Sequence, residues 1–545
     1  MSKKLIRSGL IVSAMTLISR VLGLVRDVVI ANVMGAGVMA DVFLFANKIP
    51  NFFRRLFAEG AFAQAFVPVL SEYHTRDEKS ALIHTDKDNN KNVIEEEQVI
   101  SLDETRRLIA QVSGTLGVVI TLVTLFGMLA SPLFVMLFGG GWFLDWLNNG
   151  STSVGGEKFE LAASLLKITF PYLWFISFTA LAGAVLNTLG QFAVAAFTPV
   201  LLNIAIILMA IYGAEYTQSP AYALAWGVFL GGLIQFLFQI PFLFKANVLV
   251  KPCWSWHSQG VTKIRKLIVP ALFGVSVTQI NLLLDTLIAS FLITGSISWL
   301  YYADRLLEFP LGLFGIGIAT VVLPSLSKLH SKNDPKQFSA TLDWGIKVIS
   351  LFGWPALAGL MVLAQPIIMV LFMRGEFSQI DVLQVSMALF AYLSGLLSFM
   401  FIKVLAPGYY ARQDTKTPVK IGIKAMVANM IFNLMLAPFF GYVGLAIATT
   451  MSATLNAWML YRGLKQANIY QISTNTKIFI GKLMFAAGVM AAVVYQLSAD
   501  FNVWLSMFFL EQIFQLVLCI SVGCLSYFVM IFLLGIRLGD FKVKN

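Results

Sequence analysis

Several cationic side chains stand inside long apolar stretches of this 545-residue sequence, where a charge costs several kcal/mol unless it faces protein or water. A guanidinium group donates two parallel hydrogen bonds to a phosphate and stays charged at any physiological pH. Several converging guanidinium groups therefore favour a polyanion, such as a diphosphate, as the ligand. The candidate binding residues are Arg20, Arg26, Arg54 and Arg305, together with Lys48.

Helical spacing indicates how these cations are positioned. In the apolar stretch 8–33, polar and small residues recur every three or four positions and so share one helix face, which must look inward: Ser13, Thr16, Arg20, Gly23 and Asp27. At 1.5 Å per residue, Arg20 and Arg54 each lie about 20 Å below the outer ends of their helices. The same arithmetic puts Arg26 and Lys48 at about 10 Å. An internal repeat places Arg305 opposite Lys48, so we expect the five cations to converge on one outward-leaning cavity.

Carboxylates in the same stretches allow an alternative interpretation. The acidic residues are Asp27, Asp41, Glu59, Asp304 and Glu308. Buried ion pairs among these residues would pin neighbouring helices together without binding any ligand. The sequence leaves both interpretations open.

Carboxylate, amide and hydroxyl oxygens form a second candidate site. Asp285 lies in the middle of one apolar stretch, Asn429 and Asn433 share a helix face, and Thr449 follows on the next predicted helix. Oxygen ligands of this kind suit Na⁺, which would be the protein's one cofactor. The alternative is that Asn and Thr hydrogen-bond between helices while Asp285 is protonated or paired.

Residues for catalysis are not recognisable. The chain has no G-x-x-x-x-G-K-[ST] loop, and the four histidines (74, 84, 257 and 330) stand at or beyond predicted cytoplasmic helix ends. Three cysteines without paired spacing predict neither a disulfide framework nor a metal site. We expect a transporter rather than an enzyme.

Composition defines the elements that must carry these residues. Hydrophobic residues make up 58% of the chain and charged residues 12%, against roughly 25% charge in soluble domains. Apolar stretches of about 20 residues can be placed about fourteen times, which predicts an all-α integral membrane protein. The net charge of +11 comes from basic residues scattered over short connections, so nucleic acid is not an expected partner.

Basic residues also predict the orientation. With the N-terminus inside, the inside connections hold 28 of the 39 Lys and Arg residues, whereas the outside connections hold two, Lys158 and Arg374. The positive-inside rule then places both termini in the cytoplasm. The basic N-terminus continues into an apolar stretch without a cleavage site, which predicts a retained first helix.

An internal repeat predicts the domain organisation. Ala46-Asn47-Lys48 and the residues that follow match the segment that begins at Ala303-Asp304-Arg305, and Thr198-Pro199-Val200 matches Thr417-Pro418-Val419. We expect an N-lobe of six helices over 1–246, a C-lobe of six helices over 247–465 and two additional helices over 466–545. The polar run 75–106 predicts a disordered cytoplasmic insert, and 139–158 an outside loop at the interface.

Several motifs occur in the order of a known family. They are SRVLGLVRD (19–27), ADVFLFANKIPNFFRRLFAEGAFAQAFVPVLSEY (40–73), SWLYYADRLLEFPLG (298–312), LPSLS (323–327) and VLAPGYYARQDTKTPVK (404–420). Over essentially its whole length the chain resembles the MurJ (MviN) family of the multidrug/oligosaccharidyl-lipid/polysaccharide exporter superfamily. The long insert at 75–106 departs from the family pattern.

The resemblance implies a function and further site residues. The family flips lipid II, the undecaprenyl-diphosphate-linked peptidoglycan precursor, across the bacterial inner membrane between two lobes arranged as a V. The two additional helices form a groove for the polyprenyl tail. The family's functional arginines match Arg20, Arg26, Arg54 and Arg305, and Ser19, Asp41, Asn51 and Ser298 fall on other motif positions.

Three other functions remain open from the residues alone. A drug exporter of the same superfamily would favour an acidic cavity for cationic substrates, whereas the predicted cavity is basic. A flippase for another polyprenyl-linked saccharide is harder to exclude, because its substrate shares the diphosphate. A membrane scaffold that transports nothing would leave the buried arginines unexplained. We expect a monomer that contacts lipid II and membrane lipids, with cell-wall synthesis proteins as candidate partners.

Overall fold

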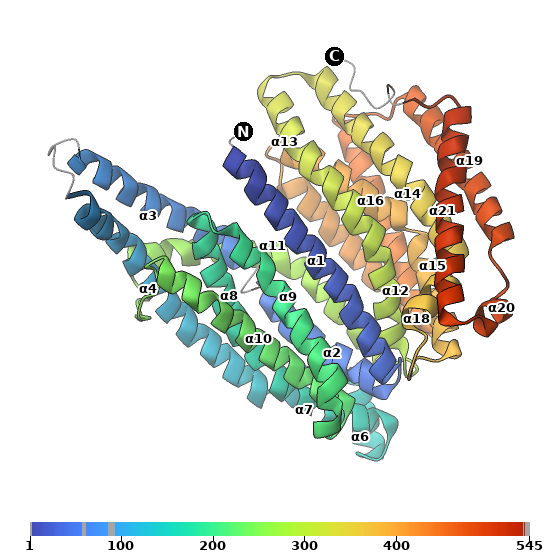
Figure 1. The fold of residues 1–545 in the computed structure, drawn as a ribbon, viewed down its shortest axis with the longest axis horizontal. Helices are drawn as coiled ribbons and strands as arrows, with labels where there is room; N and C mark the ends of the chain where they lie inside the picture. Colours follow the sequence, from blue (N-terminus) through green and yellow to red (C-terminus); the bar gives the residue numbers. More distant parts are fainter. Residues whose placement is uncertain (1–2, 57–60, 86–92, 538, 540–545) are drawn as a thin grey trace. The chain divides into compact units, whose positions relative to one another are not determined.

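The chain folds into α-helices joined by short connections (Figure 1). The computed structural model describes residues 3–56, 61–85, 93–537 and 539, and no strand occurs in these ranges. The predicted all-α fold is confirmed. The helices form two compact units, residues 1–291 and 292–545.

Unit 1 contains eleven α-helices within its described residues. They are α1 (Lys3–Met34), α2 (Val38–Arg54), α3 (Ala61–Thr85), α4 (Val93–Leu129), α5 (Ser131–Phe138), α6 (Gly140–Asn149), α7 (Val154–Thr169), α8 (Pro171–Thr188), α9 (Phe192–Leu208), α10 (Pro220–Lys245) and α11 (Gln259–Ala289). A π-helical turn (Met209–Gly213) and a 3₁₀ turn (Ala214–Tyr216) follow α9.

The packing inside unit 1 places α1 along α9 and α10 against both α8 and α9. Helices α3 and α4 run side by side, and α11 packs on α3 (Figure 1). Phe66, Leu108 and Val185 are buried where α3, α4 and α8 meet.

Unit 2 contains the remaining helices. They are α12 (Ser296–Pro310), the π-helix η4 (Leu311–Ile316), α13 (Gly317–Ser331), α14 (Pro335–Phe372), α15 (Gln379–Leu393), α16 (Leu396–Leu405), α17 (Pro407–Tyr410), α18 (Lys416–Gln466), α19 (Thr474–Leu497), α20 (Phe501–Ser506) and α21 (Phe509–Leu533). Helices α14, α19 and α21 share an apolar core that includes Leu363, Leu483 and Tyr527. Helix α18 consists of two helices, because the backbone leaves the helical conformation at Gly441 (φ 57°).

Many of these helices can cross a bilayer. Within the described residues, nine helical segments are long and apolar enough, and the pair Gln379–Leu393 and Leu396–Tyr410, bent by 40°, makes a tenth. Segment Lys416–Gln466 is counted once although it holds two helices. Helix α2 has 17 residues, fewer than the roughly 20 that a crossing needs. The number of fourteen spans therefore stays a prediction.

The matched segments of the sequence repeat share an unusual backbone feature. Residues 55–56, after α2, are π-helical, and η4 occupies the matching position after α12. In both copies a helix with an internal proline follows, α3 with Pro68 and α13 with Pro324. π-Helical turns break the regular ladder of hydrogen bonds and often mark functional segments of helices.

Two segments predicted as loops are helical in the structure. Helix α3 continues to Thr85 and α4 begins at Val93, so the predicted disordered insert 75–106 is wrong for those parts; residues 86–92 lie outside the described ranges. Asp77 is buried and accepts hydrogen bonds from the backbone N–H and hydroxyl of Thr105, which joins the two helices. The stretch 139–158, which was also predicted as a loop, contains α6. Its Trp142 is buried in the protein rather than exposed at an interface.

The compact units do not divide the chain where the repeat does. Helix α11 belongs to unit 1 because it packs on α3, with further contacts to α2, α4 and α5. The repeat counts this helix as the first of the C-lobe. The domain limits 1–246, 247–465 and 466–545 therefore remain predictions about the repeat.

Candidate functional site

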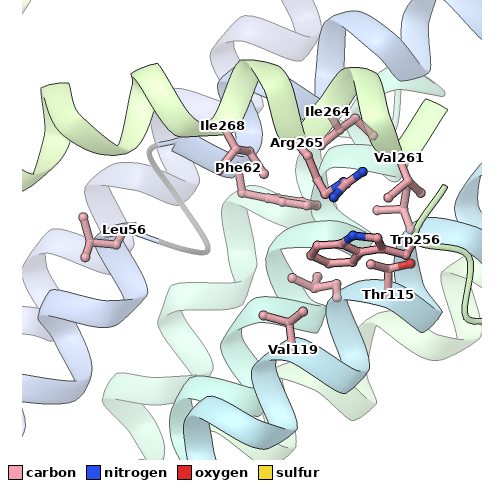
Figure 2. A pocket seen from close by; sticks show the side chains of 11 residues that line it. Leu56, Phe62, Thr115, Val119, Trp256, Val261, Ile264, Arg265 and Ile268 are labelled. Atoms are coloured by element: carbon pink, nitrogen blue, oxygen red, sulfur yellow. The ribbon is translucent and has the colours of Figure 1, made fainter. Parts of the chain in front are cut away.

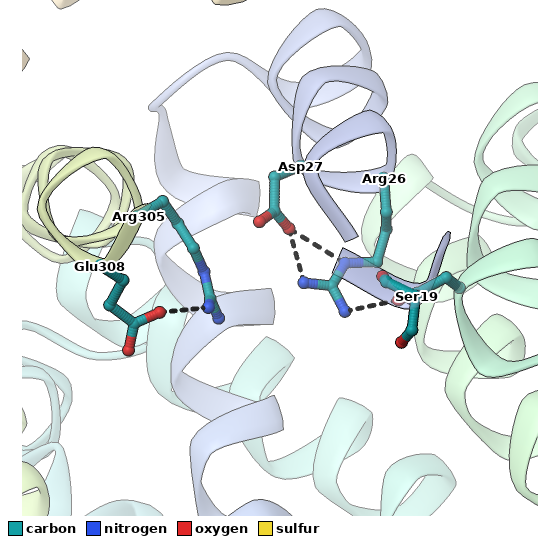
Figure 3. Close-up of polar contacts among 6 residues, drawn as sticks. Ser19, Arg26, Asp27, Arg305 and Glu308 are labelled. Carbon is teal, nitrogen blue, oxygen red and sulfur yellow. Dashed lines mark hydrogen bonds and ion pairs between the residues drawn. The ribbon is translucent and has the colours of Figure 1, made fainter. Parts of the chain in front are cut away.

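Arg26 is held by hydrogen bonds to two side chains, Asp27 and Asn203. Its Nε and Nη2 donate to Asp27 Oδ1 at 2.9 and 2.7 Å, and its Nη1 donates to Asn203 Oδ1 at 3.1 Å (Figure 3). Asn203, on α9, also donates to the Ser19 carbonyl at 3.2 Å. Asp27 is buried and the Arg26 side chain is 17% exposed, so the guanidinium group is fixed but accessible.

Arg54 and Lys48 are oriented along α2. Arg54 Nε donates to Asn51 Oδ1 at 3.0 Å, which brings together two residues that the sequence had assigned to the site. Lys48 Nζ donates to the buried Thr286 Oγ1 on α11 at 3.1 Å. Arg26 and Lys48, predicted at the same depth, thus contact different helices, α9 and α11. Both Lys48 and Arg54 are only partly buried.

Asp41 is buried in an ion pair. Lys158 Nζ, on α7, lies 3.1 Å from Asp41 Oδ2, and the two side chains are 3% and 2% exposed. Lys158 also lies over the ring of Trp142, 5.3 Å from its centroid. A buried carboxylate that is paired in this way ties α2 to α7, as the alternative interpretation of the sequence expected for this group of carboxylates.

Two further residues on α1 are more accessible. Arg20 is exposed, and Ser19 is half-buried. Ser19 lines a groove between α1, α8 and α9, with Thr16 and Asn187 as its other polar residues. The α1 residues therefore face both α9 and open space.

In unit 2, Arg305 combines an ion pair with an aromatic contact. Its Nη1 donates to Glu308 Oε2 at 2.8 Å, and its Cζ lies 4.8 Å from the ring centroid of Tyr301 (Figure 3). The Arg305 side chain is 36% exposed, and a surface pair of this kind contributes little stability, typically about 0–1 kcal/mol. Ser298, near the start of the same helix, is fully buried.

The proposed Na⁺ ligands fall in both compact units. In unit 2, Asn433 Nδ2 donates to Asn429 Oδ1 at 3.1 Å, and Asn429 Nδ2 lies 3.5 Å from Thr449 Oγ1. Both amide side chains are buried. Asp285 belongs to α11 in unit 1, where Asn281 Nδ2 lies 3.5 Å from its Oδ2.

Sequence reasoning missed two partners of the cations. Asn203 contacts Arg26 from a helix 177 positions away, and Gln279 on α11 accepts a hydrogen bond from Arg55 at 3.1 Å. An isolated amide in an otherwise apolar helix was the available signal, because such a group needs a partner when it is buried.

Arginine and lysine side chains held by amides and carboxylates on apolar helices are typical of a multi-pass α-helical membrane transporter. A family profile described as "Lipid II flippase MurJ" matches residues 30–515. The chain belongs to this MurJ family.

Curated relatives match from end to end. The sequence is 59% identical over 545 residues to a "Probable lipid II flippase MurJ" of Vibrio cholerae, covering 100% of this chain and 99% of the relative. It is 56% identical to the protein of that description from Haemophilus influenzae, with coverage of 97% and 100%. A "Lipid II flippase MurJ" of Burkholderia cenocepacia is 38% identical, with 99% of both chains covered.

Solved structures show the same fold. A lipid II flippase MurJ in an inward closed conformation superposes with a TM-score of 0.75 at 28% identity, covering 96% of this chain and 98% of that one. An inward-facing MATE transporter of the MOP superfamily has a TM-score of 0.64 at 15% identity over 84% of this chain and 97% of that one, which is a likeness of fold alone.

Proposed function

We propose that this protein flips lipid II from the cytoplasmic to the periplasmic leaflet of the bacterial inner membrane. The observation that carries the proposal is the end-to-end match to curated relatives named as lipid II flippases, at 59% and 56% identity. The whole chain takes part in this match, including the helices that carry the cations.

The diphosphate of lipid II is bound by arginine side chains in this proposal. Arg26 is positioned by Asp27 and Asn203, so that its guanidinium plane is fixed before substrate arrives. Arg54 is positioned by Asn51. A phosphate group carries negative charge, unlike an amide, and accepts two parallel hydrogen bonds from one guanidinium group, which makes the exchange of amide partners for phosphate favourable. Arg20, Lys48 and Arg305 supply further positive charge, with Ser19 and Ser298 on the same helices.

Transport proceeds by alternating access of the two repeat lobes in our proposal. The lobes are the predicted 1–246 and 247–465, with the substrate bound between them. The tail follows the additional helices α19 and α21, whose buried side packs on α14 and whose other side exposes large apolar residues, among them Phe485, Phe514 and Phe528. In this proposal both termini are cytoplasmic. The protein works as a monomer, contacts cell-wall synthesis proteins and hydrolyses no nucleotide.

Coupling to Na⁺ is the part of the proposal that rests on the oxygen-bearing side chains. In unit 2, Asn433 donates to Asn429 and Asn429 donates to Thr449, while Asp285, in unit 1, is the carboxylate predicted from the sequence. A cation bound there would favour one lobe arrangement and so reset the transporter. If Asn and Thr serve only as contacts between helices, the membrane potential or another group must couple transport.

Ligand titration tests the substrate. Purified protein is titrated with lipid II, with undecaprenyl diphosphate and with a polyprenyl diphosphate that carries an unrelated saccharide, and native mass spectrometry reports each complex. Lipid II flipping is then measured in proteoliposomes. We expect lipid II to bind most tightly and to be flipped. Equal binding and flipping of the unrelated saccharide would make the protein a general polyprenyl-diphosphate flippase, and absence of flipping would contradict the proposal.

A further inference from the structure

An apolar pocket lies in unit 1, and none of the cations assigned to the substrate is among its lining residues. It forms where the connection 246–258 meets α4 and the first turns of α11, and it encloses about 170 Å³ (Figure 2). Phe62, Val119 and Ile268 contribute to its walls. The lining is almost wholly hydrocarbon, so the pocket suits an alkyl chain better than a polar metabolite.

One cation, Arg265, stands on the wall of this pocket. Its Cζ lies 4.1 Å from the ring centroid of Trp256, and Figure 2 shows the guanidinium group over the indole. Its Nη2 has a long contact of 3.4 Å to Thr262 Oγ1, and its buried Nε has no hydrogen-bond partner among the described residues. Among the residues that the structure describes, no carboxylate lines this pocket. A buried donor of this kind gains free energy when a ligand oxygen accepts its hydrogen bond.

The connection that carries Trp256 is docked firmly on α4. Cys253 N donates to the Ala110 carbonyl at 2.8 Å, and Ser255 N lies 3.3 Å from Thr115 Oγ1. A Cβ on Gly114 would lie 2.3 Å from the Cys253 backbone, so only glycine allows this approach. The indole and the guanidinium group are therefore held in place before any ligand binds.

Aromatic and basic residues indicate the level of the pocket in the membrane. Trp254 is 53% exposed and stacks on Trp256, with 5.7 Å between ring centroids. Tryptophan side chains collect at the boundary between lipid tails and water. Lys251 and Lys266 are exposed on the same connection and on α11. Basic pockets between transmembrane helices at this level bind anionic lipid head groups.

We propose that this pocket binds an anionic phospholipid of the adjacent leaflet, with its phosphate on Arg265 and part of one acyl chain in the apolar cavity. A single guanidinium group matches the single charge of a phosphodiester, whereas a diphosphate calls for several cations. The occupant is therefore a membrane phospholipid rather than the transported lipid. This inference does not rest on lipid II being the substrate.

Two variants test the two halves of the site. Arg265→Gln removes the charge, and Val119→Trp fills the cavity and keeps Arg265. Arg462→Gln is the matched control, because Arg462 also stacks on a tryptophan, 5.1 Å from the Trp458 centroid, but lines none of the described pockets. The intact protein in detergent is titrated with phosphatidylglycerol and with phosphatidylcholine of the same chains, and native mass spectrometry gives each affinity.

The expected result is selective. Parent and control bind phosphatidylglycerol more tightly than phosphatidylcholine, and both site variants lose roughly tenfold or more of that affinity. If Arg265→Gln does not fold, Val119→Trp decides. Unchanged phosphatidylglycerol binding in the folded variants would overturn the proposal. The proposal would also be overturned if soluble glycerol phosphate competed for the site as strongly as the lipid does. It would likewise be overturned if the site variants lost only their binding of undecaprenyl diphosphate.

Discussion

At the scale of single residues, several cations of the described chain donate to neutral amides, and Arg26 also pairs with the Asp27 carboxylate. Asn203 contacts Arg26, Asn51 contacts Arg54, and Gln279 contacts Arg55. An amide orients a guanidinium group without cancelling its charge, so the group remains attractive to an anionic ligand. A carboxylate partner, such as Lys158 has in Asp41, neutralises the charge instead.

Replacing any of Arg20, Arg26, Arg54 or Arg305 by Ala should reduce transport more than abundance. One buried, charge-assisted contact to phosphate is worth about 1.5–3 kcal/mol, which is roughly ten- to a hundredfold in affinity. Lys keeps the charge and loses the paired donors, so Arg→Lys should be partly active. Complementation of a depleted strain measures transport, with membrane abundance measured in parallel and Arg462→Ala as the control. Full complementation by all four Ala variants would make these residues structural.

The Asp41–Lys158 pair should behave as a structural contact. Lys158→Met leaves the buried Asp41 carboxylate without this partner and should destabilise the protein by about 3–5 kcal/mol. The double variant Asp41→Asn with Lys158→Met should recover much of that loss, because neither charge remains. Thermal unfolding in detergent measures both. Equal stability of the single and double variants would show that the two charges do not depend on each other.

Asp285→Asn tests the coupling proposal at nearly constant side-chain volume. If Asp285 helps to bind Na⁺, the variant should flip lipid II with weakened dependence on Na⁺ and on membrane potential, because the carboxylate charge is gone. Flipping in proteoliposomes with imposed gradients provides the measurement. The same ion and potential dependence as in the parent would make Asp285 structural.

At the scale of elements, the matched π-helical turns are the notable feature. Residues 55–56 and 311–316 depart from α-helical winding at corresponding places in the two copies of the repeat. The first π-helical segment begins directly after the candidate residue Arg54, and the second begins between one and two helical turns after Arg305. The elements that carry the candidate binding residues are thus interrupted in the same way.

The insert should tolerate shortening if the contact between α3 and α4 is kept. Replacing residues 82–100 by a short Gly-Ser linker preserves Asp77 and Thr105, whose hydrogen bonds join the two helices. This variant should insert and support growth, whereas Asp77→Ala within it should lower abundance. Immunoblotting and complementation measure these outcomes. Lost activity at normal abundance would identify the insert as a regulatory or partner-binding element.

At the scale of the whole molecule, the distribution of basic residues predicts the orientation in the membrane. The predicted depths of Arg20, Arg26, Lys48 and Arg54 depend on this orientation. Cysteine labelling with an impermeant thiol reagent tests it after Cys253, Cys519 and Cys524 are replaced by Ser. Exposed positions suit the test. Cysteines that replace Thr152, Gln218 or Glu376 should react with the reagent from outside. Cysteines that replace Lys251, Lys332 or Gln471 should not react in intact cells. Labelling of the second set would contradict cytoplasmic termini.

The amino-acid sequence by itself determined the class of this protein. Apolar stretches with few charges leave helices as the only way to satisfy the backbone in lipid, and basic residues in the connections predict the orientation. The motifs around Arg20, Arg26, Arg54 and Arg305 also indicated the family, because each motif is a continuous stretch of the sequence.

Only the tertiary structure decided which partner each charge has. Asn203 contacts Arg26 and Lys158 contacts Asp41 across more than a hundred positions, and helical periodicity carries no information on such pairs. The same holds for the insert: polar composition predicted a loop, whereas the contact of α3 with α4 and the buried Asp77 make the described part helical. The pocket at Arg265 likewise depends on a connection folding back onto α4, which long-range packing fixes and local sequence does not.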